Sequence, residues 1–197
     1  LMPLVNRTES AGERARQLRI LANVHAELGD GAATVRSAEQ AIATIPPESS
    51  VDEASYARQA RARGLSLLAQ SDAALQEVDA ATRLLIDDGR SPDSFEVLRA
   101  QRLRAEFLLR AGRHADAFAV LRTPRGQQTS KESSPIHTGL ALDLLGEAQL
   151  KAGDGAAARA AHEAARSAFA RQLSDEHPYL IRNATLRNSV SHTRERS

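Results

Sequence analysis

The sequence predicts an all-α protein, an α-solenoid of about four helix hairpins followed by a C-terminal capping helix. Ala, Leu and Arg, which favour helix, dominate the chain, and aromatic residues make up only 3% of it. Apolar residues recur at helical spacing along most of its length. A turn of small residues returns at positions 29, 69, 112 and 153, in steps of 40, 43 and 41 residues. Such even spacing indicates a repeat.

Each repeat is predicted to hold one helix before this turn and one after it. In the first repeat Leu18, Leu21 and Leu28 share a helical face before the turn, and Ala38 and Ala41 share one after it. With ends defined to about 2–4 residues, the predicted helices cover residues 10–28, 31–45, 51–69, 72–87, 92–111, 113–122, 135–152, 154–173 and 178–188. We expect one repeat domain over residues 1–187, with units at 10–46, 51–88, 92–123 and 135–173, a capping helix at 178–188 and a flexible tail at 188–197.

Several helix starts carry their own sequence pattern. Ser10 with Glu13, and Ser50 with Glu53, have the spacing of capping boxes, in which the two side chains satisfy free N–H groups of the first turn. Other helices are predicted to begin at a proline, namely Pro92 after Ser91, Pro135 after Ser134 and Pro178 after His177. The polar segment between Arg122 and Ser134 is predicted to be a loop.

The turn and crossing positions resemble the tetratricopeptide repeat (TPR), a helix pair with small residues where its helices cross. The first and last units match best, at Leu21, Ala22, Gly29, Ala41 and Pro46, and at Leu145, Gly146, Gly153, Ala158 and Ala165. Ala69 replaces the turn glycine in the second unit, and Pro124 replaces a small residue in the third. The period near 41 and the segment from Leu173 to Pro178 resemble the longer repeats of kinesin light chains. The resemblance implies a right-handed superhelix whose first helices line a concave groove for a protein or peptide.

Motifs of catalytic or metal chemistry are incomplete in this sequence. The glycine clusters at 29–34 and 153–158 resemble a dinucleotide-binding fingerprint, but each follows a helical pattern instead of the strand that this site requires. His162 and Glu163 begin a zinc-protease motif in which Arg166 stands at the second histidine position. The chain has no Cys, which excludes disulfides and cysteine catalysis. We therefore expect no enzyme, no metal and no cofactor.

The resemblance assigns peptide binding to the exposed faces of the first helices. Counting back from each turn gives the candidates Arg16, Arg19, Asn23, Tyr56, Gln59, Arg63, Arg99, Arg102 and Glu106, and further along Arg110, Asp143, Glu147 and Lys151. Arginine binds carboxylates through two parallel hydrogen bonds, so we expect an acidic peptide or a C-terminal carboxylate as partner. The open alternative is that these arginines only solvate the helices and pair with acids one turn away.

Charge and hydropathy restrict the other classes of partner. The 26 basic and 25 acidic side chains nearly cancel, so no overall field draws the chain to nucleic acid. Nucleic-acid binding along the arginines is the second hypothesis, although few aromatic rings are present to stack bases. No apolar run of about 18 residues and no signal-peptide pattern occur, which predicts a cytoplasmic protein without a membrane span. The start at Leu1 and Met2 leaves open a longer, membrane-anchored parent, and a place in bacterial kinase signalling is suggested by analogy alone.

Overall fold

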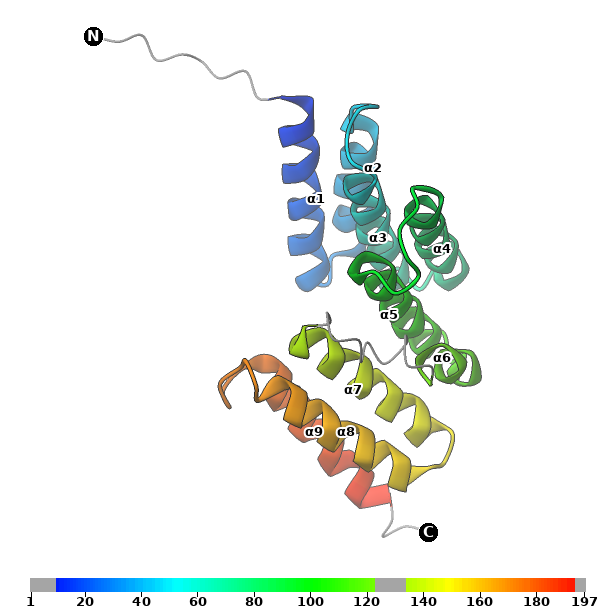
Figure 1. Cartoon of the computed structure of the whole chain (residues 1–197), viewed down its shortest axis with the longest axis vertical. Helices are drawn as coiled ribbons and strands as arrows, with labels where there is room; N and C mark the ends of the chain where they lie inside the picture. Colours follow the sequence, from blue (N-terminus) through cyan, green and yellow to red (C-terminus); the bar gives the residue numbers. More distant parts are fainter. Residues whose placement is uncertain (1–9, 123–133, 194–197) are drawn as a thin grey trace, which may run out of the picture. The chain divides into compact units, whose positions relative to one another are not determined.

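The computed structural model describes residues 10–122 and 134–193, with side chains described as far as residue 190. All regular elements within these ranges are α-helices (Figure 1). They are α1 (Ala11–Glu27), α2 (Gly31–Thr44), α3 (Val51–Leu67), α4 (Ser71–Asp87), α5 (Phe95–Arg110), α6 (His114–Leu121), α7 (Pro135–Lys151), α8 (Gly155–Phe169) and α9 (Pro178–Thr193). The predicted loop after Arg122, with Pro124, lies outside the described residues. The all-α prediction is confirmed.

The helices form two compact units, Leu1–Gly89 and Arg90–Ser197. Unit 1 contains the hairpins α1–α2 and α3–α4, and unit 2 contains α5–α6, α7–α8 and the capping helix α9. Each unit therefore holds two of the four predicted hairpins. A single continuous domain over residues 1–187 stays a prediction. None of the helices in the described ranges has the length and apolar character to cross a bilayer.

The predicted hairpin turns share one backbone arrangement. The turn residue is left-handed in each, with φ of 77° at Gly29, 59° at Ala69, 73° at Gly112 and 87° at Gly153. The amide of the next residue donates to the carbonyl five positions back, at 2.8–2.9 Å. This hydrogen bond identifies a Schellman turn, which satisfies carbonyls at a helix end. The repeat anchors found in the sequence are therefore helix-ending turns.

The two predicted capping boxes differ in outcome. The first is confirmed, because Glu13 N donates to Ser10 Oγ at 3.2 Å and Ser10 N donates to Glu13 Oε2 at 3.0 Å. The second is wrong: Ser50 occupies the N-cap position, but its side chain accepts no capping bond. The carboxylate of Glu53 instead accepts a hydrogen bond from Arg19 Nε of α1 at 3.0 Å. A charged donor on the neighbouring hairpin holds this carboxylate more strongly than a neutral amide would.

Three predicted helix ends also need correction, and the first is that of α8, which ends at Phe169 and not at 173. Helix α5 begins at Phe95 after the N-cap Ser94, and not at Pro92, because a tight turn in which Ser94 N donates to Ser91 O precedes it. Helix α9 runs to Thr193, beyond the predicted end at 188. Val190 explains the extra length, since it is only 2% exposed and a Cβ added to Gly155 of α8 would lie 3.8 Å from its Cγ1. Helices α7 and α9 begin at their prolines as predicted.

Small residues bring the helix axes close together in both units, as the repeat pattern predicts. In unit 1, Ala22, Ala38 and Ala60 form a buried cluster. At the crossing of α2 and α3 the backbones approach so closely that a Cβ on Gly64 would lie 2.8 Å from Val35 Cγ2. In unit 2, a Cβ on Gly146 would lie 2.6 Å from the His162 ring. These glycines therefore set the distance between helices.

Candidate functional site

Within each unit the first helices of consecutive hairpins lie against each other. Helix α1 contacts α3 in unit 1, and α7 contacts both α5 and α9 in unit 2. The candidate residues predicted from the sequence lie on these helices. The structure separates them into two groups, one in each unit, and each group has its own surroundings.

In unit 1 the predicted arginines connect α1 to α3. Arg19 Nε lies 3.0 Å from Glu53 Oε2, and its guanidinium carbon lies 5.6 Å from the centre of the Tyr56 ring. Arg63 Nη1 lies 3.4 Å from Glu27 Oε1. These ion pairs join neighbouring hairpins, whereas the alternative reading from the sequence had placed the acids one turn away on the same helix. Such contacts position the two hairpins against each other.

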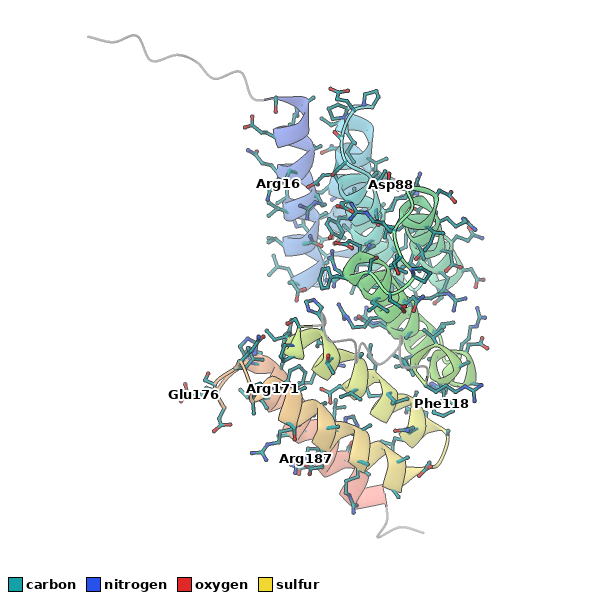
Figure 2. All side chains as sticks on the ribbon, viewed as in Figure 1. Arg16, Asp88, Phe118, Arg171, Glu176 and Arg187 are labelled. Carbon is teal, nitrogen blue, oxygen red and sulfur yellow. The ribbon has the colours of Figure 1, made fainter. Side chains whose placement is uncertain are left out.

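The other predicted residues of this group differ in accessibility. Arg16 is exposed on α1 (Figure 2), and Asn23 is half-buried. Gln59 is 1% exposed, and its Nε2 donates to Ser55 Oγ at 3.1 Å. The Ser55 hydroxyl in turn donates to the carbonyl of Ala81 in α4 at 3.3 Å. Gln59 is therefore a core residue that ties α3 to α4, and a groove ligand does not reach it in this structure.

In unit 2 the predicted residues Arg99 and Arg102 lie near the first turn of α7. Arg102 is only 8% exposed, which makes it a largely buried residue and not part of an open groove. Burial, and then the charges of Arg102 and Arg99, lower the pKa of His137. The His137 ring meets Phe95 edge to face, with ring centres 4.8 Å apart. This corner is a packed contact between α5 and α7.

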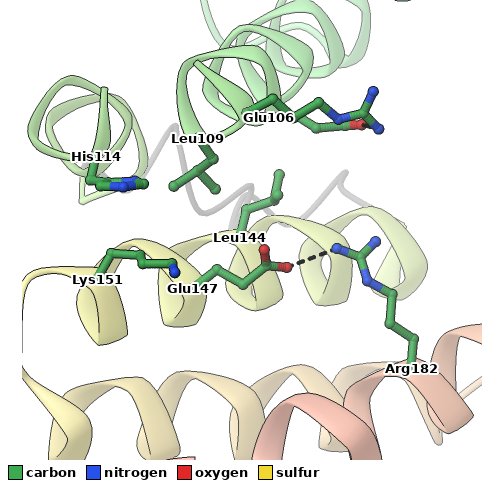
Figure 3. Close-up of a pocket in the computed structure, with 8 residues that line it drawn as sticks. Glu106, Leu109, His114, Leu144, Glu147, Lys151 and Arg182 are labelled. Atoms are coloured by element: carbon green, nitrogen blue, oxygen red, sulfur yellow. Dashed lines mark hydrogen bonds and ion pairs between the residues drawn. The ribbon is translucent and has the colours of Figure 1, made fainter. Parts of the chain in front are cut away.

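A cavity of about 280 Å³ lies in unit 2 among the first helices (Figure 3). It is lined by Glu106, Leu109 and Arg110 of α5, His114 of α6, Leu144, Glu147 and Lys151 of α7, and Arg182 of α9. The two leucines supply apolar surface between the helices, and the charged side chains surround it. This cavity brings together Glu106, Arg110, Glu147 and Lys151, which the repeat count had assigned to the groove.

The charges around this cavity do not balance. Glu106 accepts a hydrogen bond from Arg110 at 2.8 Å, and Glu147 accepts one from Arg182 at 2.8 Å (Figure 3). Lys151 has no ion pair within the part of the chain that the structure describes. His114 presents a buried Nδ1 that lacks a hydrogen-bond partner there. Three basic side chains against two acidic ones leave an excess charge of +1 before His114 is counted.

Sequence reasoning missed His114 and Arg182 as lining residues. His114 follows the third hairpin turn directly, and the count was made only backwards from each turn. Arg182 lies on α9, which was predicted as a cap and not as a further first helix. The contact of α9 with α7 brings Arg182 to Glu147. If the capping helix is counted as the first helix of a further repeat, the sequence places Arg182 on the same side as the other first-helix residues.

A second polar cluster lies in the core of unit 2 and joins α7, α8 and α9. His162 Nδ1 lies 2.9 Å from Asp143 Oδ1, and Asn183 Nδ2 donates to the same oxygen at 2.7 Å and to the carbonyl of His162 at 2.9 Å. An Asp–His pair occurs in many hydrolases, but a solvent-accessible nucleophile must accompany it. Here His162 and Asn183 are 0% exposed and Asp143 is 3% exposed. The prediction of Asp143 as a groove residue is therefore wrong, and the cluster is part of the core.

Metal-ligand chemistry finds no support in the described ranges. No group of three or more His, Asp or Glu side chains placed to hold a metal ion occurs in them. His162, the first residue of the incomplete zinc motif, makes its contact with Asp143 and Asn183 instead.

Comparison with known proteins identifies the fold. The sequence matches no protein-family model, and no curated protein matches it. BtubC (BKLC) from P. vanneervenii superposes with a TM-score of 0.74, covering 92% of this chain and 73% of that one at 14% identity. A putative kinesin light chain with nearly identical TPR-like repeats from Podosopora anserina gives 0.70, covering 96% and 90% at 17% identity. A MamA RS-1 double mutant gives 0.51, covering 95% and 99% at 14% identity. The chain thus has the TPR-type repeat fold, as the sequence predicted.

Proposed function

We propose that this protein is a non-catalytic scaffold that binds an acidic segment of a partner protein in the unit 2 cavity. The observation that carries the proposal is the excess positive charge there, with Lys151 and His114 facing the cavity without partners among the described residues. TPR-like folds are generally used for protein–protein interaction, which agrees with this assignment. The cytoplasmic location and the signalling role suggested by the sequence belong to the same proposal.

The shape of the cavity favours a short acidic stretch over a small metabolite. Its volume of about 280 Å³ lies just below the range of small-molecule pockets, which span roughly 300–1,000 Å³. One acidic side chain or a terminal carboxylate beside one apolar side chain fits this space. The carboxylate would bond to Lys151, and the apolar group would cover Leu109 and Leu144. Glu106 holds Arg110 and Glu147 holds Arg182, so both arginines have fixed positions at the edge of the cavity.

Arg16 and Asn23 of unit 1 lie outside the unit 2 cavity, and their assignment to a groove stays a prediction from the sequence. In this proposal the contacts between α1 and α3 are the role of Arg19, Tyr56 and Arg63. Arg99 contributes positive charge to unit 2, and Arg102 contributes from its largely buried position.

Titration of fluorescent acidic peptides with the full chain tests the proposal. We expect Lys151→Glu to weaken binding by about tenfold or more, because a hydrogen bond to a charged group contributes about 1.5–3 kcal/mol. Arg166→Glu is the matched control, since it makes the same charge change at an exposed position of α8 away from the cavity. Equal losses in both variants would mean that only overall charge matters, and would contradict a specific site.

The same titration with single-stranded nucleic acid examines the second hypothesis. Binding through phosphates falls steeply as salt is added, because counterions are released. A steep salt dependence without any peptide binding would replace the acidic-peptide proposal by the nucleic-acid one.

A further inference from the structure

Helix α1 carries an apolar face that is exposed in the structure. Ile20, Leu21, Val24 and Leu28 are 50%, 44%, 49% and 76% exposed. Their spacing places them along one side of the helix. Large apolar side chains that gather on one helix face indicate a contact surface, whereas single ones do not.

The repeat itself shows what such a face does elsewhere in the chain. Nine and five residues before the hairpin turn, α3 has Ala60 and Gly64, and both are buried. Gly64 meets Val35 of the preceding helix α2. The same positions of α7 hold Leu144, at 5% exposure, and Ala148, at 0%, in a cluster with residues of α5, α6 and α8. In α1 these positions hold Ile20 and Val24, so the exposed face is the one that this fold uses to pack against another helix.

The other end of the chain has the opposite character. Arg182, Thr185, Asn188 and Ser189 of α9 are exposed, and Tyr179 and Ile181 are its exposed large apolar residues. Repeat arrays need a polar outer face at their ends to remain in solution. The exposed face of α9 is largely of this polar kind, whereas the exposed face of α1 is apolar.

The charges on α1 indicate which helix would cover it. Arg14 and Arg16 are exposed near its start, where the carboxylate of the exposed Glu13 is held by the amide of Ser10, and Glu27 is exposed near its end. Glu27 also contacts Arg63 of its own chain at 3.4 Å, which still leaves 78% of its side chain accessible. A helix of the same sequence that runs in the opposite direction would bring its acidic end to this basic end, and the reverse. An interface with two-fold symmetry requires this self-complementarity.

We propose that α1 is the dimerisation surface of this protein and that its occupant is α1 of a second copy, packed antiparallel about a two-fold axis. Ile20 then faces Val24 of the second copy, and Arg16 lies near Glu27 of the second copy. The contact consists of one helix face per chain, which is at the small end of interfaces, below about 1,200 Å² in total. We therefore expect reversible dimerisation that depends on protein concentration.

Sedimentation equilibrium of the full chain, from micromolar to millimolar concentration, tests the proposal. We expect a monomer–dimer equilibrium whose dissociation constant rises at least tenfold in Val24→Asp, because two carboxylates would enter the apolar contact. Ile181→Asp is the matched control, an equally exposed apolar position on α9, and should leave the equilibrium unchanged. A protein that is monomeric throughout, or a dimer that Val24→Asp does not weaken, would overturn the proposal. A monomer at all concentrations would indicate that the apolar face of α1 contacts a different protein.

A charge exchange tests the antiparallel orientation. Arg16→Glu and Glu27→Arg should each weaken the dimer, since each places like charges opposite one another across the interface. The double variant restores opposite charges and should regain most of the affinity. A double variant that is as weak as the sum of its single changes would rule out this orientation. Circular dichroism of each variant establishes that these exposed substitutions leave the helices folded.

Discussion

The two units are built from the same hairpin, but they use polar side chains differently. In unit 1 the hairpins are joined by ion pairs between partly exposed groups, such as Arg19 with Glu53 and Arg61 with Glu39. In unit 2 the polar groups that join α7, α8 and α9 lie in the core, where Asp143, His162 and Asn183 share hydrogen bonds. The same repeat can thus be stabilised by ion pairs near the surface or by hydrogen bonds between buried side chains.

This difference determines which surface is open to a ligand. Two of the three unit 1 arginines that the sequence offered as peptide ligands, Arg19 and Arg63, are engaged by acids of the neighbouring hairpin. In unit 2 the core supplies hydrogen bonds between α7, α8 and α9, and at the cavity the pair Arg182–Glu147 also joins α9 to α7. Lys151 and His114, which line the cavity, are the residues on which the proposed partner site rests.

Asp143→Ala should produce the largest effect and tests the cohesion of unit 2. Removing this carboxylate takes away the partner of His162 Nδ1 and one of the two acceptors of Asn183 Nδ2, both of which are buried. The loss of a partner from a buried charged network costs about 3–5 kcal/mol. Urea unfolding of the full chain measures the change, and hydrogen exchange should show α9 opening first.

Glu53→Ala is the comparison in unit 1. Its partner Arg19 keeps 15% of its side chain in contact with water, and partly exposed ion pairs contribute about 0–1 kcal/mol. If Glu53→Ala cost as much as Asp143→Ala, the contrast between the two units would be wrong.

Gly64→Ala should have the next largest effect and tests the close helix crossing in unit 1. The added Cβ would lie 2.8 Å from Val35 Cγ2 and 3.0 Å from the carbonyl oxygen of Gly31, and that backbone atom has little freedom to move. Overpacking of this kind costs about 1–3 kcal/mol in thermal or urea unfolding. Gly12→Ala is the matched control, because its Cβ would meet nothing within 4 Å. Equal stability of the two variants would show that α2 and α3 can separate without cost.

Ala69→Gly should have a smaller effect, and in the opposite direction. Ala69 is left-handed with φ of 59°, a conformation that is unfavourable for alanine by about 1–2 kcal/mol. Glycine relieves this strain, but its unfolded chain is more disordered by about 0.4–1 kcal/mol. We therefore expect a net stabilisation of up to about 1 kcal/mol. Gly112→Ala at the equivalent turn of unit 2 should destabilise, and a turn insensitive to both changes would contradict the shared geometry.

Most of the fold could be predicted from the sequence because local chemistry encodes it. Turn glycines and Ala69 mark the helix ends, and small residues such as Ala22 and Ala158 mark the crossings. The site could be predicted only in part. Helical spacing tells which residues share a face, but it does not tell which of them, like Gln59, are covered by the neighbouring hairpin. The role of Glu53 depended on a side chain 34 positions away, which no local pattern contains.

The smallest predicted effect concerns His137, which connects α5 to α7 in unit 2. Burial, and then the charges of Arg102 and Arg99, hold its pKa below the ordinary value of about 6.5. As the pH falls through about 6.5, the unfolded chain therefore binds a proton that the folded chain does not, and the free energy of unfolding decreases. The decrease should stop once the pH is below the folded-state pKa as well.

Urea unfolding of the full chain between about pH 7.5 and 5.5 measures this linkage. His137→Phe keeps a ring against Phe95 but cannot titrate, so the variant should lose less stability on acidification than the wild type. His25→Phe, which makes the same change in unit 1, is the control for the loss of a histidine elsewhere in the chain. Because His137 is only partly buried, the difference between the curves should be a fraction of the ~1.4 kcal/mol that one proton contributes per pH unit. Parallel wild-type and His137→Phe curves would mean that Arg99 and Arg102 do not act on α7, and would leave Asp143, His162 and Asn183 as the polar link within unit 2.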